Sequence, residues 1–260
     1  MIKDISILPI EGFSLVGQLY LPDLDGKYPL VCLCHGAPPG VPPPPDDGGY
    51  PELAEKLCRR GLAVYWFNLR GSGDSGGNFD LLGWTRDLQA VLDYLWGLDS
   101  FDKSRLSLVG FSAGAAVAIY VASFDPHVSR VIACCSPAEF KPGPGDSWQA
   151  WVDRFREIGA IRDDDFPSSV EQWAADCQSI NPIDHIAAVS PRPLLIIHGN
   201  MDSSVPVENA HRLYEKARPP KQLVIIDGAG HRLRRDPRVI DTIVSWLSSS
   251  TIDPPSAGKL

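Results

Sequence analysis

The sequence has no apolar run long enough to span a membrane, although 44% of its 260 residues are hydrophobic. Segments such as Leu30–Cys34 and Leu194–Ile197 are wholly apolar but have only the length of a β-strand. The N-terminal residues also lack the apolar core of a signal peptide. We therefore expect a cytoplasmic protein without a membrane partner.

The sequence also lacks a cysteine framework and an excess of positive charge. None of the six cysteines forms a Cys-x-x-Cys pair, and four of them lie in apolar, strand-like segments, where cysteine behaves as a small buried hydrophobe. This argues against a disulfide framework and against a metal site. A net charge of −8 argues against nucleic acid as a partner.

What the sequence does contain is a regular alternation of short apolar segments and amphipathic segments. In residues 85–95, for example, Leu88, Val91 and Leu92 share one helical face. Short connections between alternating strands and helices predict an α/β fold, a mostly parallel eight-stranded sheet with helices on both faces. The predicted strands are residues 2–7, 13–21, 30–34, 63–67, 106–109, 130–135, 194–198 and 223–226.

Residues 137–190 interrupt this alternation because the segment is too long for a simple crossover. Its aromatic residues recur at helical spacing, which predicts a helical cap inserted into a single α/β domain over residues 1–260, with residues 249–260 as a frayed tail. The alternative is that these aromatic residues only pack helices onto the sheet. Those expected to contact substrate are Trp148, Trp151, Phe155 and Trp173.

The segment that carries chemistry is Gly110-Phe111-Ser112-Ala113-Gly114, between an apolar strand and a helix of small residues. Gly-x-Ser-x-Gly in this setting is typical of a nucleophile elbow, a sharp turn that strains the serine backbone and exposes its hydroxyl. The pattern alone also fits a plain glycine-rich turn. We predict that Ser112 is a nucleophile and that the Ala113 amide, at the helix start, is one donor to an oxyanion.

Two other strands end in glycine-containing segments. One ends in His35-Gly36-Ala37, which predicts the Ala37 amide as the second oxyanion donor, with an ordinary Gly-Pro loop as the alternative. Residues 71–76 match Gly-x-Gly-x-x-Gly, a pattern of dinucleotide sites. A dinucleotide site needs that segment to open a helix directly, and more loop intervenes here, so we interpret it as a tight turn.

A nucleophilic serine needs a base, and the base needs an orienting carboxylate. Asp202 follows one predicted strand and His231 follows the next. Because the carboxyl ends of parallel strands share one edge of a sheet, we expect Ser112, Asp202 and His231 to meet there. Asp227 is a rival acid four residues before His231, and Asp202 has the alternative role of capping the helix that Pro206 starts.

Other polar side chains near these motifs are interpreted as structural. His35 and His198 precede glycines at strand ends, but neither follows the final strand, where the base is expected. The arginines that follow His231 form either a solvated face or an anion-binding site. They are Arg232, Arg234, Arg235 and Arg238.

Over residues 1–248 the motifs together resemble the α/β-hydrolase superfamily. They are His35-Gly36, Gly71-Ser72-Gly73-x-Ser75-x-Gly77, Gly110-x-Ser112-x-Gly114, His198-Gly199-x-x-Asp202-x-x-Val205-Pro206 and Gly230-His231. They are most similar to small serine esterases, dienelactone-hydrolase-like proteins and the catalytic domains of prolyl-oligopeptidase-type peptidases. A serine at position 112 departs from the cysteine of dienelactone hydrolases, and the lack of a propeller domain departs from gated oligopeptidases.

The resemblance and the residues predict a serine hydrolase of small carboxylic esters with short to medium chains. His231 would take the proton of Ser112, Asp202 would hold the imidazole, and no cofactor is needed. The alternatives are a small-peptide or acyl-amide hydrolase, a thioesterase, and a non-catalytic receptor or scaffold on the same fold.

Overall fold

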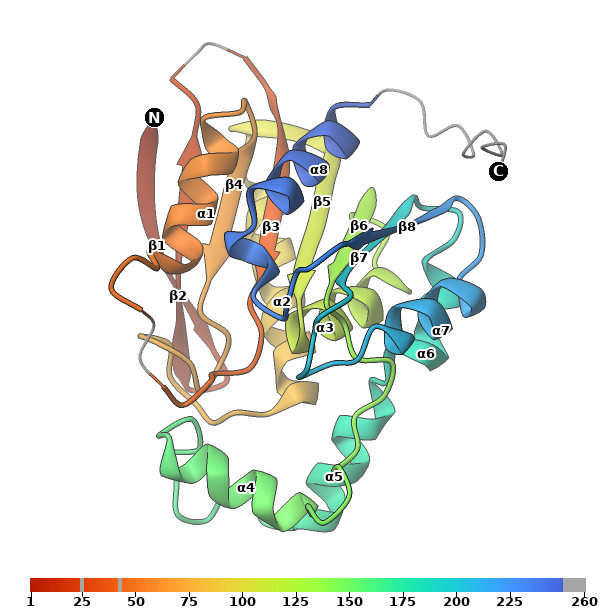
Figure 1. The fold of residues 1–260 in the computed structure, drawn as a ribbon. Helices are drawn as coiled ribbons and strands as arrows, with labels where there is room; N and C mark the ends of the chain where they lie inside the picture. The colour runs from red at the N-terminus through yellow and green to blue at the C-terminus, as the bar shows by residue number, and fades with distance from the viewer. Residues whose placement is uncertain (24–25, 42–43, 250–260) are drawn as a thin grey trace, which may run out of the picture.

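The protein is built on one eight-stranded sheet in the order β1-β2-β4-β3-β5-β6-β7-β8, seen in a computed structural model that describes residues 1–23, 26–41 and 44–249 (Figure 1). β2 is antiparallel to β1 and β4, and the other pairings are parallel, so the predicted mostly parallel α/β sheet is confirmed. The strands are β1 (Ile2–Ile10), β2 (Phe13–Leu21), β3 (Tyr28–Cys34), β4 (Ala63–Phe67), β5 (Phe101–Phe111), β6 (Arg130–Cys134), β7 (Leu194–Gly199) and β8 (Lys221–Ile226).

Helices cover both faces of the sheet (Figure 1). α1 (Gly49–Cys58) and α8 (Pro237–Ser248) cover one face, and α2 (Leu81–Gly97), α3 (Ala113–Ala122) and α7 (Glu208–Lys216) cover the other. In β3, Leu30 and Cys32 join the core under α2 and α3, whereas Val31 and Leu33 join the core under α1 and α8. This double coverage explains why the strand is apolar at every position.

Residues 137–190 contain α4 (Trp148–Glu157), α5 (Val170–Ser179), α6 (Pro182–His185) and the short 3₁₀ helix η1 (Ile186–Val189). α4 and α5 lie beyond the carboxyl ends of the strands (Figure 1). The insertion is joined to the loop that follows β4: the Phe79 amide donates to the Ala160 carbonyl over 2.8 Å, and the Phe79 and Phe155 rings stack with centroids 3.8 Å apart.

Some elements differ from the predicted ranges. β5 begins at Phe101, five residues earlier than predicted, because Phe101 and Asp102 pair with Tyr28 and Pro29 despite the polar residues that follow. The segment at residues 71–76 is a loop, since α2 begins only at Leu81. No helix in the described ranges is long and apolar enough to cross a membrane. The expected frayed tail falls almost wholly on residues 250–260, outside those described.

Candidate active site

Ser112 lies at the sharp turn between β5 and α3. Its backbone has φ 54° and ψ −124°, a conformation that non-glycine residues rarely adopt and that costs free energy. The turn is held on both sides, because the Ser112 amide donates to the Cys134 carbonyl over 2.9 Å and the Ser112 carbonyl accepts from the Ala115 amide over 2.9 Å. The surrounding structure therefore fixes the strained serine in one position.

The two glycines of this turn are required by close packing. A Cβ at Gly110 would lie 2.4 Å from the Ala115 Cα, inside α3, and a Cβ at Gly114 would lie 2.2 Å from the His35 carbonyl oxygen, at the end of β3. Side chains at either position would push strand and helix apart. This is the physical reason for the Gly-x-Ser-x-Gly pattern in this chain.

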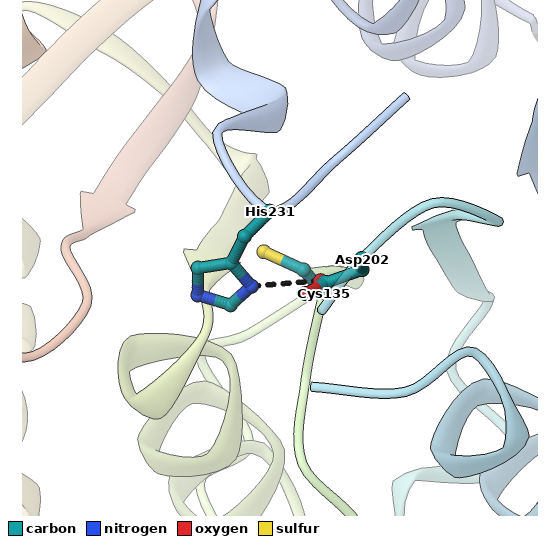
Figure 2. Close-up of side chains that lie close together, drawn as sticks. All are labelled: Cys135, Asp202 and His231. Carbon is teal, nitrogen blue, oxygen red and sulfur yellow. Dashed lines mark hydrogen bonds and ion pairs between the residues drawn. The ribbon is translucent and has the colours of Figure 1, made fainter. Parts of the chain in front are cut away.

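Asp202 and His231 come from the loops that follow β7 and β8, and they meet (Figure 2). The His231 Nδ1 lies 2.7 Å from the Asp202 Oδ2. The Asp202 side chain is fully buried, whereas the His231 side chain remains 28% exposed. The pair therefore has a buried carboxylate behind the ring and an imidazole that faces the solvent side.

The Asp202 carboxylate is held by more than His231. Its Oδ1 accepts from the amides of Ser204 and Val205 over 2.9 and 2.8 Å, and the His198 Nε2 lies 3.4 Å from its Oδ2. Burial favours the neutral form, but the hydrogen bonds from His198, His231 and the Val205 amide outweigh it and hold the pKa of Asp202 well below its usual range.

The sequence left two alternatives open, that Asp202 caps a helix and that Asp227 is the acid, and the structure shows neither arrangement. Asp202 does not cap α7, whose N-cap residue is Val207. The rival Asp227 is exposed, and its Oδ1 accepts a hydrogen bond from the Asn200 side chain over 2.8 Å.

His35 orients the loop that carries the expected oxyanion donor. Its Nε2 accepts from the Leu69 amide over 3.0 Å, so the ring proton sits on Nδ1, which donates to the Gly36 carbonyl over 2.7 Å. Because a trans peptide is planar, the Ala37 N–H points away from this carbonyl. Among the described residues, neither the Ala37 amide nor the Ala113 amide has a hydrogen-bond acceptor, so both are free to donate to a ligand.

A cavity of about 390 Å³ contains Ser112, His231 and Ala37 in its lining. Its walls are mostly apolar and come from the loops after β3, β4, β5, β6 and β8. The apolar wall residues include Pro38, Pro39, Val41, Tyr50, Phe111 and Leu233. The cavity therefore places a serine hydroxyl and an imidazole within a largely hydrophobic space.

The four aromatic residues expected to contact substrate do not line this cavity. Phe155 stacks on Phe79, and the Trp173 ring is buried against the same core. Phe155 and Trp173 thus pack the insertion onto the rest of the domain, which is the alternative role that the sequence analysis gave for these aromatic residues. The sequence left both interpretations open because helical spacing indicates that a helix face is buried but does not indicate what covers it. The other two, Trp148 and Trp151, pack edge to face with each other in α4, with ring centroids 5.1 Å apart.

The sequence did not single out several residues at the cavity. Asp47 forms two hydrogen bonds with the Arg234 guanidinium, over 2.5 and 2.6 Å, and this ion pair joins the loop before α1 to the short 3₁₀ helix η2 (Leu233–Arg235). The Tyr50 hydroxyl accepts from the Gly36 amide over 3.3 Å. Asp47 is more than 180 residues from Arg234 in the chain, so no local pattern links them.

The arginine cluster after His231 is mostly paired. Arg235 contacts Asp46 over 2.6 Å and Arg238 contacts Asp236 over 2.6 Å, in addition to the Arg234 pair. Arg232 lies exposed at the cavity.

Comparisons with known proteins identify the family and the fold of the chain. The model of the prolyl oligopeptidase family matches residues 52–251. An uncharacterized protein of Mycobacterium tuberculosis is 29% identical over 239 residues, which cover 92% of this chain and 74% of that protein. A monoacylglycerol lipase of Mycolicibacterium smegmatis is 25% identical over 281 residues, covering 94% and 96%. The crystal structure of the α/β hydrolase GrgF from a Penicillium species superimposes with a TM-score of 0.76 at 19% identity, covering 95% and 98% of the two chains, a likeness of fold.

Proposed function

The chain belongs to the prolyl oligopeptidase family, with the α/β-hydrolase fold, and we propose that it is a serine hydrolase of carboxylic esters. The observation that carries this proposal is that Ser112, at a strained turn, shares one cavity with an imidazole that is backed by a buried carboxylate. A protein that only binds a ligand has no need of all three groups.

In the proposed mechanism, His231 accepts the Ser112 proton through its Nε2 while the serine oxygen attacks the ester carbonyl. Asp202 keeps the ring proton on Nδ1, 2.7 Å away, and stabilises the imidazolium that forms. The free amides of Ala37 and Ala113 donate to the oxyanion of the tetrahedral intermediate. His231 then protonates the leaving alcohol, and water releases the acyl group from Ser112 by the reverse sequence.

The size and character of the cavity support small, apolar ester substrates. A volume of about 390 Å³ is at the lower end of ligand sites, and its apolar walls favour acyl chains by about 0.8 kcal/mol per buried CH₂. The gain should stop once the cavity is filled, so short to medium chains are favoured over long ones. The similarity to a monoacylglycerol lipase supports an ester as the bond that is cleaved.

A second candidate is hydrolysis of small peptides or acyl amides. The match to the prolyl oligopeptidase family favours it, since an amide needs the same nucleophile, base and oxyanion donors. Arg232, exposed at the cavity, would then be available to a carboxylate of the peptide.

The two candidates are separated by a series of p-nitrophenyl esters from acetate to palmitate, assayed beside aminoacyl-p-nitroanilides. We expect kcat/KM to be highest for a short or medium acyl chain and every anilide to be slower than the best ester. A maximum at palmitate would contradict a cavity that limits the length of the acyl chain. Faster cleavage of an anilide than of every ester would establish the peptidase activity instead.

A further inference from the structure

Cys135 lies beside the Asp202–His231 pair, although it takes no part in the proposed hydrolysis (Figure 2). The Cys135 Sγ, an Asp202 oxygen and a His231 ring nitrogen all lie within 4.8 Å of one another. In the described part of the chain, no other three such side chains converge in this way. Cys135 directly follows β6 and has a positive φ of 46°, and its amide donates to the Ile197 carbonyl over 2.9 Å.

We propose that Cys135, Asp202 and His231 form an inhibitory site for a soft divalent cation, for which zinc is the natural probe. Thiolate, imidazole and carboxylate are the three ligand types that zinc takes in proteins, at about 2.0–2.3 Å from the metal. Ligand atoms around a tetrahedral ion at these distances lie about 3.5 Å apart. The three side chains therefore need to move by only about an ångström to surround one ion.

The site is accessible but largely enclosed. Cys135 and His231 both line the cavity beside Ser112, so a hydrated ion can reach them from solvent. Asp202 and Cys135 are buried, and Asp202 is held in place by the amides of Ser204 and Val205, so two of the ligands start in fixed positions. A thiolate and an imidazole select zinc or cadmium over magnesium or calcium, which prefer oxygen ligands.

The binding step is balanced without an oxidant or reductant. Three bonds form, from the metal to Cys135 Sγ, to His231 Nδ1 and to an Asp202 oxygen, and water completes the tetrahedron. The Cys135 thiol releases one proton to solvent, and the His231 proton moves from Nδ1 to Nε2. The hydrogen bond between His231 Nδ1 and Asp202 Oδ2 is lost.

This tautomer shift is the cause of inhibition, a consequence that rests on the proposed function. An imidazole that carries its proton on Nε2 cannot accept the proton of Ser112, and Asp202 no longer orients the ring. The ion thus blocks the base directly, through the ring of His231. Inhibition should therefore lower kcat more than it raises KM.

The experiment measures hydrolysis of p-nitrophenyl butyrate at buffered free zinc concentrations, for the wild-type protein and for Cys135→Ala and Cys177→Ala. Cys177 is a matched control, because it is also a buried cysteine but lies in α5, away from the cavity. Each variant is normalised to its own activity without metal. We expect Cys135→Ala to raise the zinc concentration that gives half-maximal inhibition at least about ten-fold. Loss of a residue that only supports a metal ligand already lowers metal affinity by this factor, and Cys135 would bind the metal directly. Cys177→Ala should behave as the wild type.

Binding is measured separately with cadmium, by the ultraviolet charge-transfer band of a cadmium–thiolate bond. The band should appear with the wild type and with Cys177→Ala and be absent with Cys135→Ala, and it needs no enzymatic activity. Failure of ester hydrolysis would thus overturn the proposed function but leave this site testable. Equal zinc sensitivity of all three proteins, or no cadmium band with the wild type, would overturn the site.

Discussion

At the scale of single residues, the candidate site depends on one strained serine and on the neighbouring residues that fix its backbone conformation. Gly110 allows α3 to pack on β5, Gly114 allows α3 to approach the end of β3, and Ser112 between them has a positive φ. The sequence could predict this turn because the requirement is local: a strand, two glycines around a serine, and a helix of small residues.

Asp202 and Asp227 make a sharp comparison at this scale. Asp202→Asn should lower kcat by roughly 10³–10⁴-fold, because an amide in place of the carboxylate no longer holds the ring proton of His231 on Nδ1. Asp227→Asn should change kcat only slightly, because Asp227 is exposed and bonded to Asn200. Both variants are compared by steady-state kinetics at matched thermal stability. A larger loss with Asp227→Asn would transfer the acid role to that residue.

Not every residue of the site could be predicted from the sequence. Asp202 and His231 follow strands in a recognisable order, so their meeting could be expected from the topology. Cys135 appears in the sequence as one more apolar cysteine at the end of the predicted strand 130–135. Its place beside the Asp202–His231 pair depends on the parallel packing of β6 on β7 and of β7 on β8, which no local pattern encodes.

At the scale of elements, strands buried on both faces were the most predictable, since apolar runs such as Leu194–Ile197 are expected where helices cover both faces of a sheet. Element ends were less predictable. Residues 102–105 are polar, yet they belong to β5 at the sheet end remote from the site, where Asp102 pairs with Pro29 before the register shifts and Leu106 pairs with Leu30. α2 starts at Leu81 because the Asp80 carboxylate accepts from the Leu82 amide over 3.1 Å.

The aromatic residues of the insertion were predicted to contact substrate, and the structure assigns them to packing. Phe155→Ala should lower the free energy of unfolding by about 2–3 kcal/mol, below the cost for a fully buried phenylalanine because Phe155 is only partly buried. KM for p-nitrophenyl butyrate should stay unchanged. Urea denaturation and kinetics check both, with Phe124→Ala as the control because that ring is exposed. A raised KM with an unchanged free energy of unfolding would show that Phe155 contacts the substrate.

The ion pair between Asp47 and Arg234 joins two elements at the cavity wall and should make stability depend on pH. The guanidinium of Arg234 lowers the pKa of Asp47 from its ordinary value of 3.8 to about 2. A carboxyl with a depressed pKa stabilises the fold above its unfolded pKa and loses that contribution as the pH falls through the folded value. The pair should thus contribute on the order of 2 kcal/mol at pH 5 and above, and progressively less from about pH 4 to pH 2.

The measurement is the difference in free energy of unfolding between the wild type and Asp47→Asn, by urea denaturation from pH 6 downwards. The difference should shrink below about pH 4. Asp46→Asn is the matched control, because Asp46 also pairs with an arginine but its side chain is 75% exposed, where ion pairs contribute little. If the difference in free energy of unfolding stays constant with pH, the charge of Asp47 does not contribute to stability.

At the scale of the whole molecule, parallel strands explain how residues that are far apart in sequence form one site. β5, β7 and β8 all end at the same edge, so Ser112, Asp202 and His231 approach although 119 positions separate the first from the last. This arrangement could be predicted from the alternation of strands and helices alone. The cavity could not, because its walls come from the loops after β3, β4, β5, β6 and β8, whose mutual packing no periodic pattern describes.

The central claim, that Ser112 is a nucleophile activated by His231, is tested most directly by a fluorophosphonate, which reacts covalently only with an activated serine. The adduct is located by mass spectrometry of the intact and digested protein. We expect one adduct, on Ser112, in the wild type, no adduct in Ser112→Ala, and strongly slowed labelling in folded His231→Gln. An unlabelled wild-type protein, or an adduct on any other serine, would contradict the account.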